Sequence, residues 1–126
     1  MKKWIRWLDI ERAMVCADGG ALHREPPRLL EAREVWRQFR DNQVAAELYF
    51  GEASFCVTGH IDHVDRDERG RIRVHFRVNP YETMRVIFPE EALRQLTEIL
   101  RGDEVTCRVR VAEVDSGVVL LEAVEL

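Results

Sequence analysis

Apolar and polar residues alternate through most of the second half of the chain, a pattern typical of strands with one buried face. The clearest example covers residues 71–78. Its apolar positions are Ile72, Val74, Phe76 and Val78, and the positions between them are Arg71, Arg73, His75 and Arg77. Similar alternation predicts strands near residues 55–62, 84–88, 105–111 and 118–126. In the first of these, Phe55, Val57, Gly59 and Ile61 share one face.

A helix is predicted at residues 89–102, between the third and fourth of these five strands. Pro89 opens it, two glutamates follow in the first turn, and Gly102 ends it in a left-handed conformation. Its apolar stripe consists of Ala92, Leu93, Leu96, Ile99 and Leu100. A helix in this place is the element order of an OB-fold, so residues 52–126 are predicted to form a five-stranded barrel.

Residues 1–51 are predicted to be a helical extension that packs on the barrel. Residues 28–50 have helical periodicity and end at Gly51; the expected apolar face contains Leu29, Ala32, Val35, Trp36, Phe39, Ala46, Tyr49 and Phe50. Residues 1–15 fit either a helix or an extended segment, and a short helix is preferred. Two breaks follow, at Gly19–Gly20 and Pro26–Pro27.

The length, composition and net charge of the chain exclude some functions but do not identify one. The chain has 126 residues, of which 46% are hydrophobic and 33% charged, as expected for one folded domain with an extension. The formal net charge is -4. This charge argues against tight, non-specific binding of nucleic acid but leaves room for a local basic strip.

Cysteine usage and the start of the chain indicate a cytoplasmic protein. Cys16, Cys56 and Cys107 are odd in number and show no CxxC spacing, so reduced thiols are expected. Charged residues such as Arg6 and Asp9 interrupt any apolar core of a signal peptide. No stretch approaches the ~20 apolar residues needed to cross a bilayer, so no membrane association is expected.

Three short motifs resemble the tRNA_anti-like family of small OB-fold proteins. They are Asn42 with Ala45–Ala46 and Tyr49, the Val57–Thr58–Gly59 run, and the segment from Leu100 to Thr106. The resemblance covers about residues 31–126. It implies a five-stranded barrel and, by analogy of fold, nucleic-acid binding. The chain departs from the family at Cys107–Arg108, where many members have Gly, and in having no secretion or lipoprotein signal.

The outward face of the second strand is the main candidate binding site. Arg71, Arg73, His75 and Arg77 project from one side, and Arg85 on the third strand extends the strip. This is the usual ligand face of OB-folds. The candidate set also includes basic residues of the charged turn and the fourth strand, and one turn aromatic: Arg66, Arg69, Arg108, Arg110 and Tyr81. The alternative is a solvated face balanced by nearby acidic residues.

Two functions remain open at this stage. Arginines can pair with phosphates, and Tyr81 can stack on a base, which predicts weak or selective binding of single-stranded nucleic acid, DNA or RNA. Phe55, Phe76 and Phe88 are expected in the core instead. The alternative is a protein-interaction module, either a monomer that docks a partner or a homodimer, with Trp4 and Trp7 as docking residues.

No pattern in the sequence predicts catalysis, a cofactor or a metal. His60 and His63 are three residues apart, which places them on opposite faces of a strand. Ser54 and Ser116 lack the context of a catalytic triad, and the cysteines lack an activating neighbour. The expected activity is therefore binding.

Overall fold

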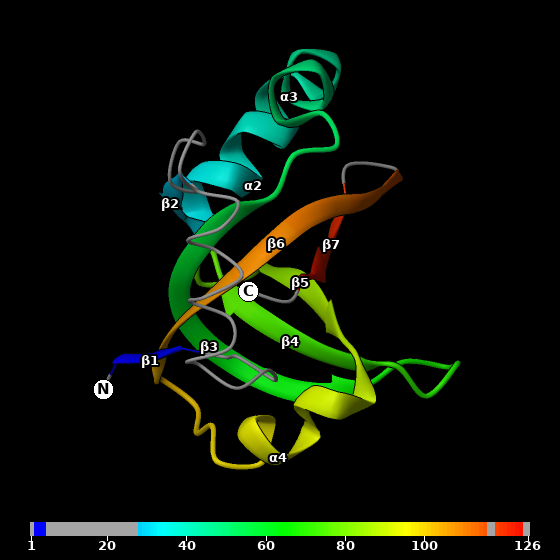
Figure 1. Ribbon diagram of the computed structural model, residues 1–126. Coiled ribbons are helices and arrows are strands. Elements are labelled where there is room, and N and C mark those ends of the chain that lie inside the picture. Colours follow the sequence, from blue (N-terminus) through cyan, green and yellow to red (C-terminus); the bar gives the residue numbers. More distant parts are fainter. Residues whose placement is uncertain (1, 5–27, 116–117, 125–126) are drawn as a thin grey trace, which may run out of the picture.

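The computed structural model describes residues 2–4, 28–115 and 118–124 (Figure 1). The strands are β1 Lys2–Trp4, β2 Leu29–Glu31, β3 Phe55–Arg66, β4 Ile72–Arg77, β5 Thr83–Phe88, β6 Glu104–Asp115 and β7 Val118–Ala123. The helices are α2 Ala32–Asp41, α3 Gln43–Phe50, the 3-10 turn η1 Glu90–Ala92 and α4 Leu93–Leu96.

Five strands close into a barrel in the order β3–β4–β5–β7–β6, and β6 pairs back onto β3. All these pairs are antiparallel except β5 with β7, and the helical segment η1–α4 lies between the third and fourth barrel strands. This topology is the OB-fold, as predicted. Helices α2 and α3 lie at one end of the barrel and α4 at the other (Figure 1).

The long strand β3 belongs to two pairings and turns the corner between them. Residues 55–60 pair with β6, and residues 61–66 pair with β4. Ile61 lies opposite Phe76 while His63 lies opposite His75, so Asp62 is an extra residue, a β-bulge. The bulge changes which side chains face outward in the second half of β3.

A turn before β6 holds the backbone at this corner. The Ile61 amide donates to the Asp103 carbonyl at 2.9 Å, and the Gly102 amide donates to the Ile61 carbonyl at 2.8 Å. Gly102 has φ 89°, a left-handed conformation that glycine adopts without strain. The left-handed Gly102 that the sequence predicted is therefore present and fixes the start of the bulge.

One hydrophobic core joins the barrel to the helix that precedes it. The predicted inward residues of β4, from Ile72 to Val78, are all buried. Phe55, Phe76 and Phe88 are also buried, as expected. Ala32, Val35 and Phe39 of α2 belong to the same cluster, and α2 contacts β3, β4 and β5.

The helix predicted at 28–50 is interrupted. Residues 29–31 form β2, parallel to β3, and the two helices meet at Asn42, which has the extended φ of -157°. The Asn42 side chain accepts a hydrogen bond from the Ala45 amide at 3.0 Å and so caps α3. Most of the predicted apolar face is buried or half-buried, but Leu29 and Tyr49 are exposed.

The helix predicted at 89–102 is shorter than expected. It ends at Leu96, and of its apolar stripe Leu93 and Leu100 are exposed. Asp103 accepts a hydrogen bond from the Leu100 amide at 2.9 Å, which holds the segment before Gly102 as a turn. Ala92 and Leu96 are buried as predicted, and Ile99 packs against the core.

The N-terminal segment is extended where the structure describes it. Lys2–Trp4 forms β1, which pairs in parallel with β6, so the preference for a helix is wrong at these residues. Trp7 lies outside the described residues. Among the residues described, no helix is long and apolar enough to cross a membrane.

Gly59 is predicted to be required where α2 crosses the barrel. A Cβ atom at this position would lie 2.9 Å from Phe76 Cδ1 and 3.0 Å from Ala32 Cβ. We expect Gly59→Ala to lower the free energy of unfolding by about 1–3 kcal/mol through overpacking. Urea denaturation tests this, with His60→Ala at the exposed neighbouring position as control. Equal midpoints for Gly59→Ala and the parent protein would contradict the prediction.

Candidate binding face

The outward side chains of β4 lie beside carboxylates of β3. Arg73 lies opposite Asp65 and donates to both of its oxygens, from Nε at 2.8 Å and from Nη2 at 2.9 Å. Arg77 donates from Nη2 to Asp62 Oδ1 at 3.0 Å. The basic row predicted from the sequence is thus present on the outer face, but its members are paired with acids.

The same pairing extends to the turn between β3 and β4. Arg71 donates to Asp67 at 2.7 Å, and Arg66 pairs with Glu90 of η1. The hydrogen bond from His63, followed by that from Arg77, lowers the pKa of Asp62 to about 2. Burial opposes ionisation of Asp65, but hydrogen bonds from Arg73 and His75 outweigh it and lower its pKa to about 2. These acids are ionised at neutral pH.

His75 is on the predicted face but is not accessible, which corrects its predicted role. It is 4% exposed because the His63 ring stacks on it, with centroids 3.9 Å apart. Its Nε2 lies 2.9 Å from Asp65 Oδ1, and its Nδ1 lies 3.2 Å from the Thr83 hydroxyl. Burial lowers the pKa of His75 despite the hydrogen bond to Asp65. A ligand on this face meets His63 first.

A hollow of about 480 Å³ lies at the end of the face where β3 turns into β4. Its lining contains five arginines, Arg66, Arg69, Arg71, Arg73 and Arg85, with Ile87, and three acidic residues, Asp67, Glu68 and Glu113. Within the described ranges, no ion pair or hydrogen bond involves the guanidinium group of Arg69 or Arg85, although the Arg69 backbone amide donates to Asp67 Oδ1 at 2.9 Å. Among the described residues that line the hollow, these two guanidinium groups are the most available to an anionic ligand.

The remaining predicted residues lie elsewhere. Tyr81 is 93% exposed in the turn between β4 and β5, at the end of β4 far from the hollow. Arg108 donates to the Ser54 hydroxyl at 2.8 Å, and Arg110 donates to Glu122 at 3.2 Å. Neither lines the hollow. The backbone of Trp4 lies in β1.

A second hollow, of about 430 Å³, was not predicted. It lies between the start of α2, the middle of β3 and the β4–β5 turn, and Arg33, His60 and Arg77 contribute to its lining. Arg33 and Arg77 come from segments far apart in the sequence. No local sequence motif predicts this hollow, because its lining residues come together only when α2 packs onto the barrel.

Comparisons with known proteins support the fold. No protein-family model and no curated protein sequence matches the chain, so membership of the tRNA_anti-like family stays a prediction. A proposed nucleic-acid-binding lipoprotein from Klebsiella pneumoniae is similar in structure, with TM-score 0.62 and 18% identity, over 86% of this chain and 97% of that one. A proposed aspartyl-tRNA synthetase from Leishmania major gives TM-score 0.54 and 9% identity, over 91% of this chain and 25% of the synthetase. At these identities the likeness concerns the OB-fold alone.

Asp65 is predicted to stabilise the face because it serves both Arg73 and the buried His75. We expect Asp65→Ala to lower the free energy of unfolding by about 1 kcal/mol, since two donors lose their acceptor at a half-exposed position. Thermal or urea denaturation measures the change. Glu122→Ala, which breaks the exposed pair with Arg110, is the matched control and should change stability less. Equal effects of the two substitutions would contradict the prediction.

Proposed function

We propose that this protein is a non-catalytic OB-fold binding protein that takes single-stranded nucleic acid on the face of β4 and β5. The observation that carries the proposal is the hollow with five arginines at one end of that face. OB-folds bind oligonucleotides on the corresponding strands and the loops beside them. The resemblance to the tRNA_anti-like family points to the same class of ligand.

The electrostatics favour phosphate contact at Arg69 and Arg85. Their charges are not matched by a described carboxylate, whereas Arg66, Arg71 and Arg73 are held in place by ion pairs. A paired guanidinium keeps part of its donor capacity, because each has five N–H groups. The paired arginines therefore shape the hollow, and the unpaired ones supply most of the attraction.

The same charges predict that binding is weak. The net charge of the chain is -4, and Asp67, Glu68 and Glu113 share the hollow with the arginines. Incoming phosphates must compete with these carboxylates. Tyr81 offers one stacking platform at the far end of β4, so a bound strand that reached it would run along the whole face. We therefore expect the protein to prefer a strand that can reach from the hollow to Tyr81, and not to bind every polyanion equally.

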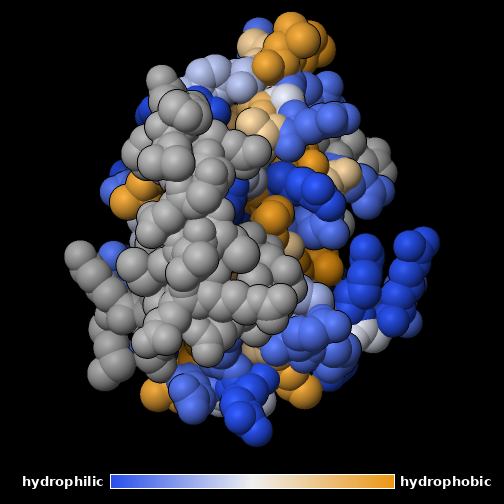
Figure 2. All heavy atoms as spheres, viewed as in Figure 1, coloured by the Kyte–Doolittle hydropathy of each residue, from blue (hydrophilic) through white to orange (hydrophobic). Residues whose placement is uncertain are grey.

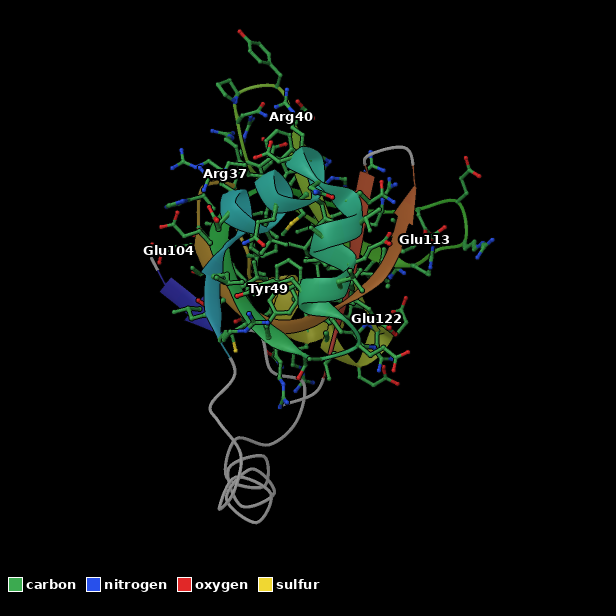
Figure 3. All side chains as sticks on the ribbon, turned by 90° about the horizontal axis from the view of Figure 1, so that it is seen from above. Arg37, Arg40, Tyr49, Glu104, Glu113 and Glu122 are labelled. Carbon is green, nitrogen blue, oxygen red and sulfur yellow. The ribbon has the colours of Figure 1, made fainter. Side chains whose placement is uncertain are left out.

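We expect Arg69→Ala/Arg85→Ala to weaken binding of a fluorescent single-stranded oligonucleotide about tenfold. Removing two phosphate contacts should also reduce the slope of log K against log salt by about 1.4. Fluorescence anisotropy at several salt concentrations measures both quantities. The matched control is Arg37→Ala/Arg40→Ala, which removes the same charge from α2. Figure 3 places both control residues beside the helices, away from Glu113 of the hollow.

Equal weakening by the two double variants would show that only net charge matters and would remove the hollow from the proposal. An absence of binding by the folded parent protein at low salt would end the nucleic-acid proposal. All four arginines are outside the buried core, so we expect each variant to fold, and circular dichroism checks this.

A second candidate function is self-association through α3. Val44 and Leu48 are one helical turn apart and are 67% and 81% exposed. Figure 2 shows a group of apolar atoms over α3 at the top of the view. A helix face of this kind can pair with its own copy about a two-fold axis, as in most homodimers.

We expect Leu48→Glu to abolish any dimer, because two copies would bring the new carboxylates together in an apolar contact. Light scattering of the parent protein and of Leu48→Glu over a range of concentrations measures the change. Glu47→Gln, at a neighbouring position on α3, is the control. A parent protein that remains a monomer at all concentrations would contradict this second candidate.

A further inference from the structure

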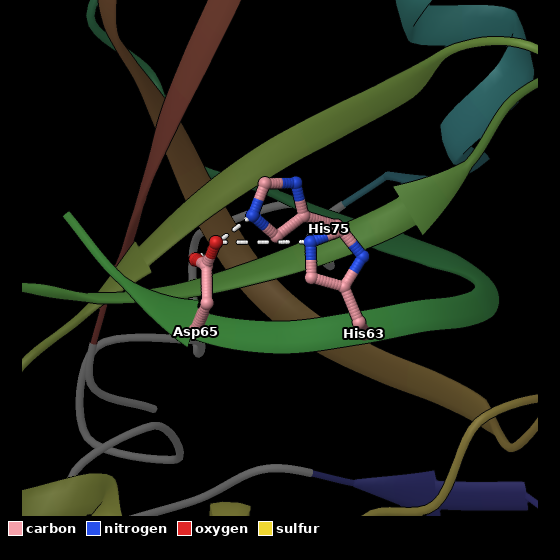
Figure 4. Close-up of side chains that lie close together, drawn as sticks. All are labelled: His63, Asp65 and His75. Atoms are coloured by element: carbon pink, nitrogen blue, oxygen red, sulfur yellow. Dashed lines mark hydrogen bonds and ion pairs between the residues drawn. The ribbon is translucent and has the colours of Figure 1, made fainter.

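The β-bulge in β3 gathers three potential metal ligands on the outer face of the barrel. Because Asp62 is an extra residue, His63 turns outward and lies directly opposite His75 of β4. Asp65, two residues further along β3, points to the same place (Figure 4). One ligand atom from each of His63, Asp65 and His75 lies within 4.8 Å of the others.

The distances fit a small divalent ion. His75 Nε2 lies 2.9 Å from Asp65 Oδ1, and His63 Nε2 lies 3.7 Å from Asp65 Oδ2. Ligand atoms of a tetrahedral zinc site lie roughly 3.4 Å apart, given metal–ligand bonds of about 2.1 Å. The two observed distances, one to each oxygen of Asp65, fall on either side of that value. The His63 and His75 rings are stacked with an interplanar angle of 15°, so the rings must tilt for both lone pairs to meet one ion.

The histidines are also held as metal ligands usually are. Asp62 Oδ2 lies 2.7 Å from His63 Nδ1, and a carboxylate accepts, so His63 Nδ1 carries the hydrogen of this bond. This leaves a lone pair on His63 Nε2, which lies 3.7 Å from Asp65 Oδ2. The Thr83 hydroxyl lies beside His75 Nδ1 and can accept a hydrogen from it when Nε2 binds an ion. A carboxylate or hydroxyl behind the ligating imidazole is the common second-shell arrangement.

We propose that His63, Asp65 and His75 form a binding site for a divalent transition-metal ion, with zinc as the best match. Two imidazoles and one carboxylate are a ligand set suited to zinc and unsuited to Mg²⁺ or Ca²⁺, which prefer oxygen ligands. The three residues leave a fourth position of a tetrahedral ion open. His63 is about half exposed, so that position faces solvent and can hold water or an oxygen of a ligand.

Arg73 opposes the ion and sets how tightly it binds. Its guanidinium occupies both oxygens of Asp65 and brings a positive charge next to the site. Arg77 and, at 3.7 Å, Arg101 also lie against Asp62 behind His63. Metal binding must displace or share the Arg73 contact, so the affinity is lower than that of a buried structural zinc site. The positive charge of Arg73 would therefore weaken metal binding, whereas it would favour the binding of nucleic acid in the hollow.

Titration of the full chain with Co²⁺ tests the site, because bound Co²⁺ has visible absorption bands and Zn²⁺ then displaces it. The protein carries Cys16→Ser in all samples, so that the thiol outside the described residues cannot bind the ion. Cys56 and Cys107 are buried. We expect one saturable site, no thiolate charge-transfer band and full displacement by Zn²⁺.

Single variants assign the ligands. His63→Ala should weaken Co²⁺ binding at least tenfold, and Asp62→Asn about tenfold through loss of the second-shell carboxylate. His60→Ala removes an exposed histidine of the same strand and should leave binding unchanged. Arg73→Gln should strengthen metal binding several-fold, the reverse of its expected effect on oligonucleotide binding.

The proposal is overturned if the parent protein shows no saturable Co²⁺ binding, or if His60→Ala and His63→Ala weaken binding equally. His63 is exposed, so its substitution does not endanger folding, and circular dichroism checks this. Failure of the metal titration leaves the oligonucleotide result unaffected, because the two experiments use different probes and different key residues.

Discussion

The backbone contact between Ile61 and the Gly102–Asp103 turn determines how this barrel closes. Both backbone groups of Ile61 bond to that turn, at the point where β3 leaves β6 and joins β4. The barrel needs a sharp bend there, and the extra residue Asp62 provides it. The bend has a second effect, because it rotates the following side chains by one position. His63 and Asp65 reach the outer face as a result, and Val64 packs against the core.

Charge pairing then decides what the outer face can do. A row of arginines on a strand suggests a surface ready to bind anions, yet most of these arginines already have an acidic partner. Such pairs contribute little stability at an exposed surface, but they fix the orientation of long side chains that would otherwise move freely. The ion pairs therefore give the face a defined arrangement of side chains, and they leave it with little net positive charge to attract a ligand. Among the described residues that line the hollow, the guanidinium groups of Arg69, in the turn between β3 and β4, and of Arg85, opposite His75 on β5, have no acidic partner.

The sequence predicted the barrel because alternation and the position of the helix are local signals that the fold preserves. The inward residues of β4, the left-handed Gly102 and the core phenylalanines follow from it directly. The break at Asn42 was missed since the apolar face continues across it, although Asn is a common N-cap. The histidine cluster was missed for a different reason: strict alternation sends His63 inward, and only register with β4 reveals the bulge. Likewise, the pairing of Arg73 with Asp65 requires knowing which residues lie opposite each other.

The close packing of Ala32 on Gly59 has a consequence for dividing this chain into fragments. Glycine leaves a gap in β3 that the first turn of α2 fills, and Val35 and Phe39 of α2 are buried in the same core cluster as Phe55. A fragment that begins after Gly51 would lack α2, so the gap at Gly59 would be open to water and aromatic rings of the core would be exposed. A fragment with an intact interior must therefore retain β2 and α2, which cover this side of the barrel.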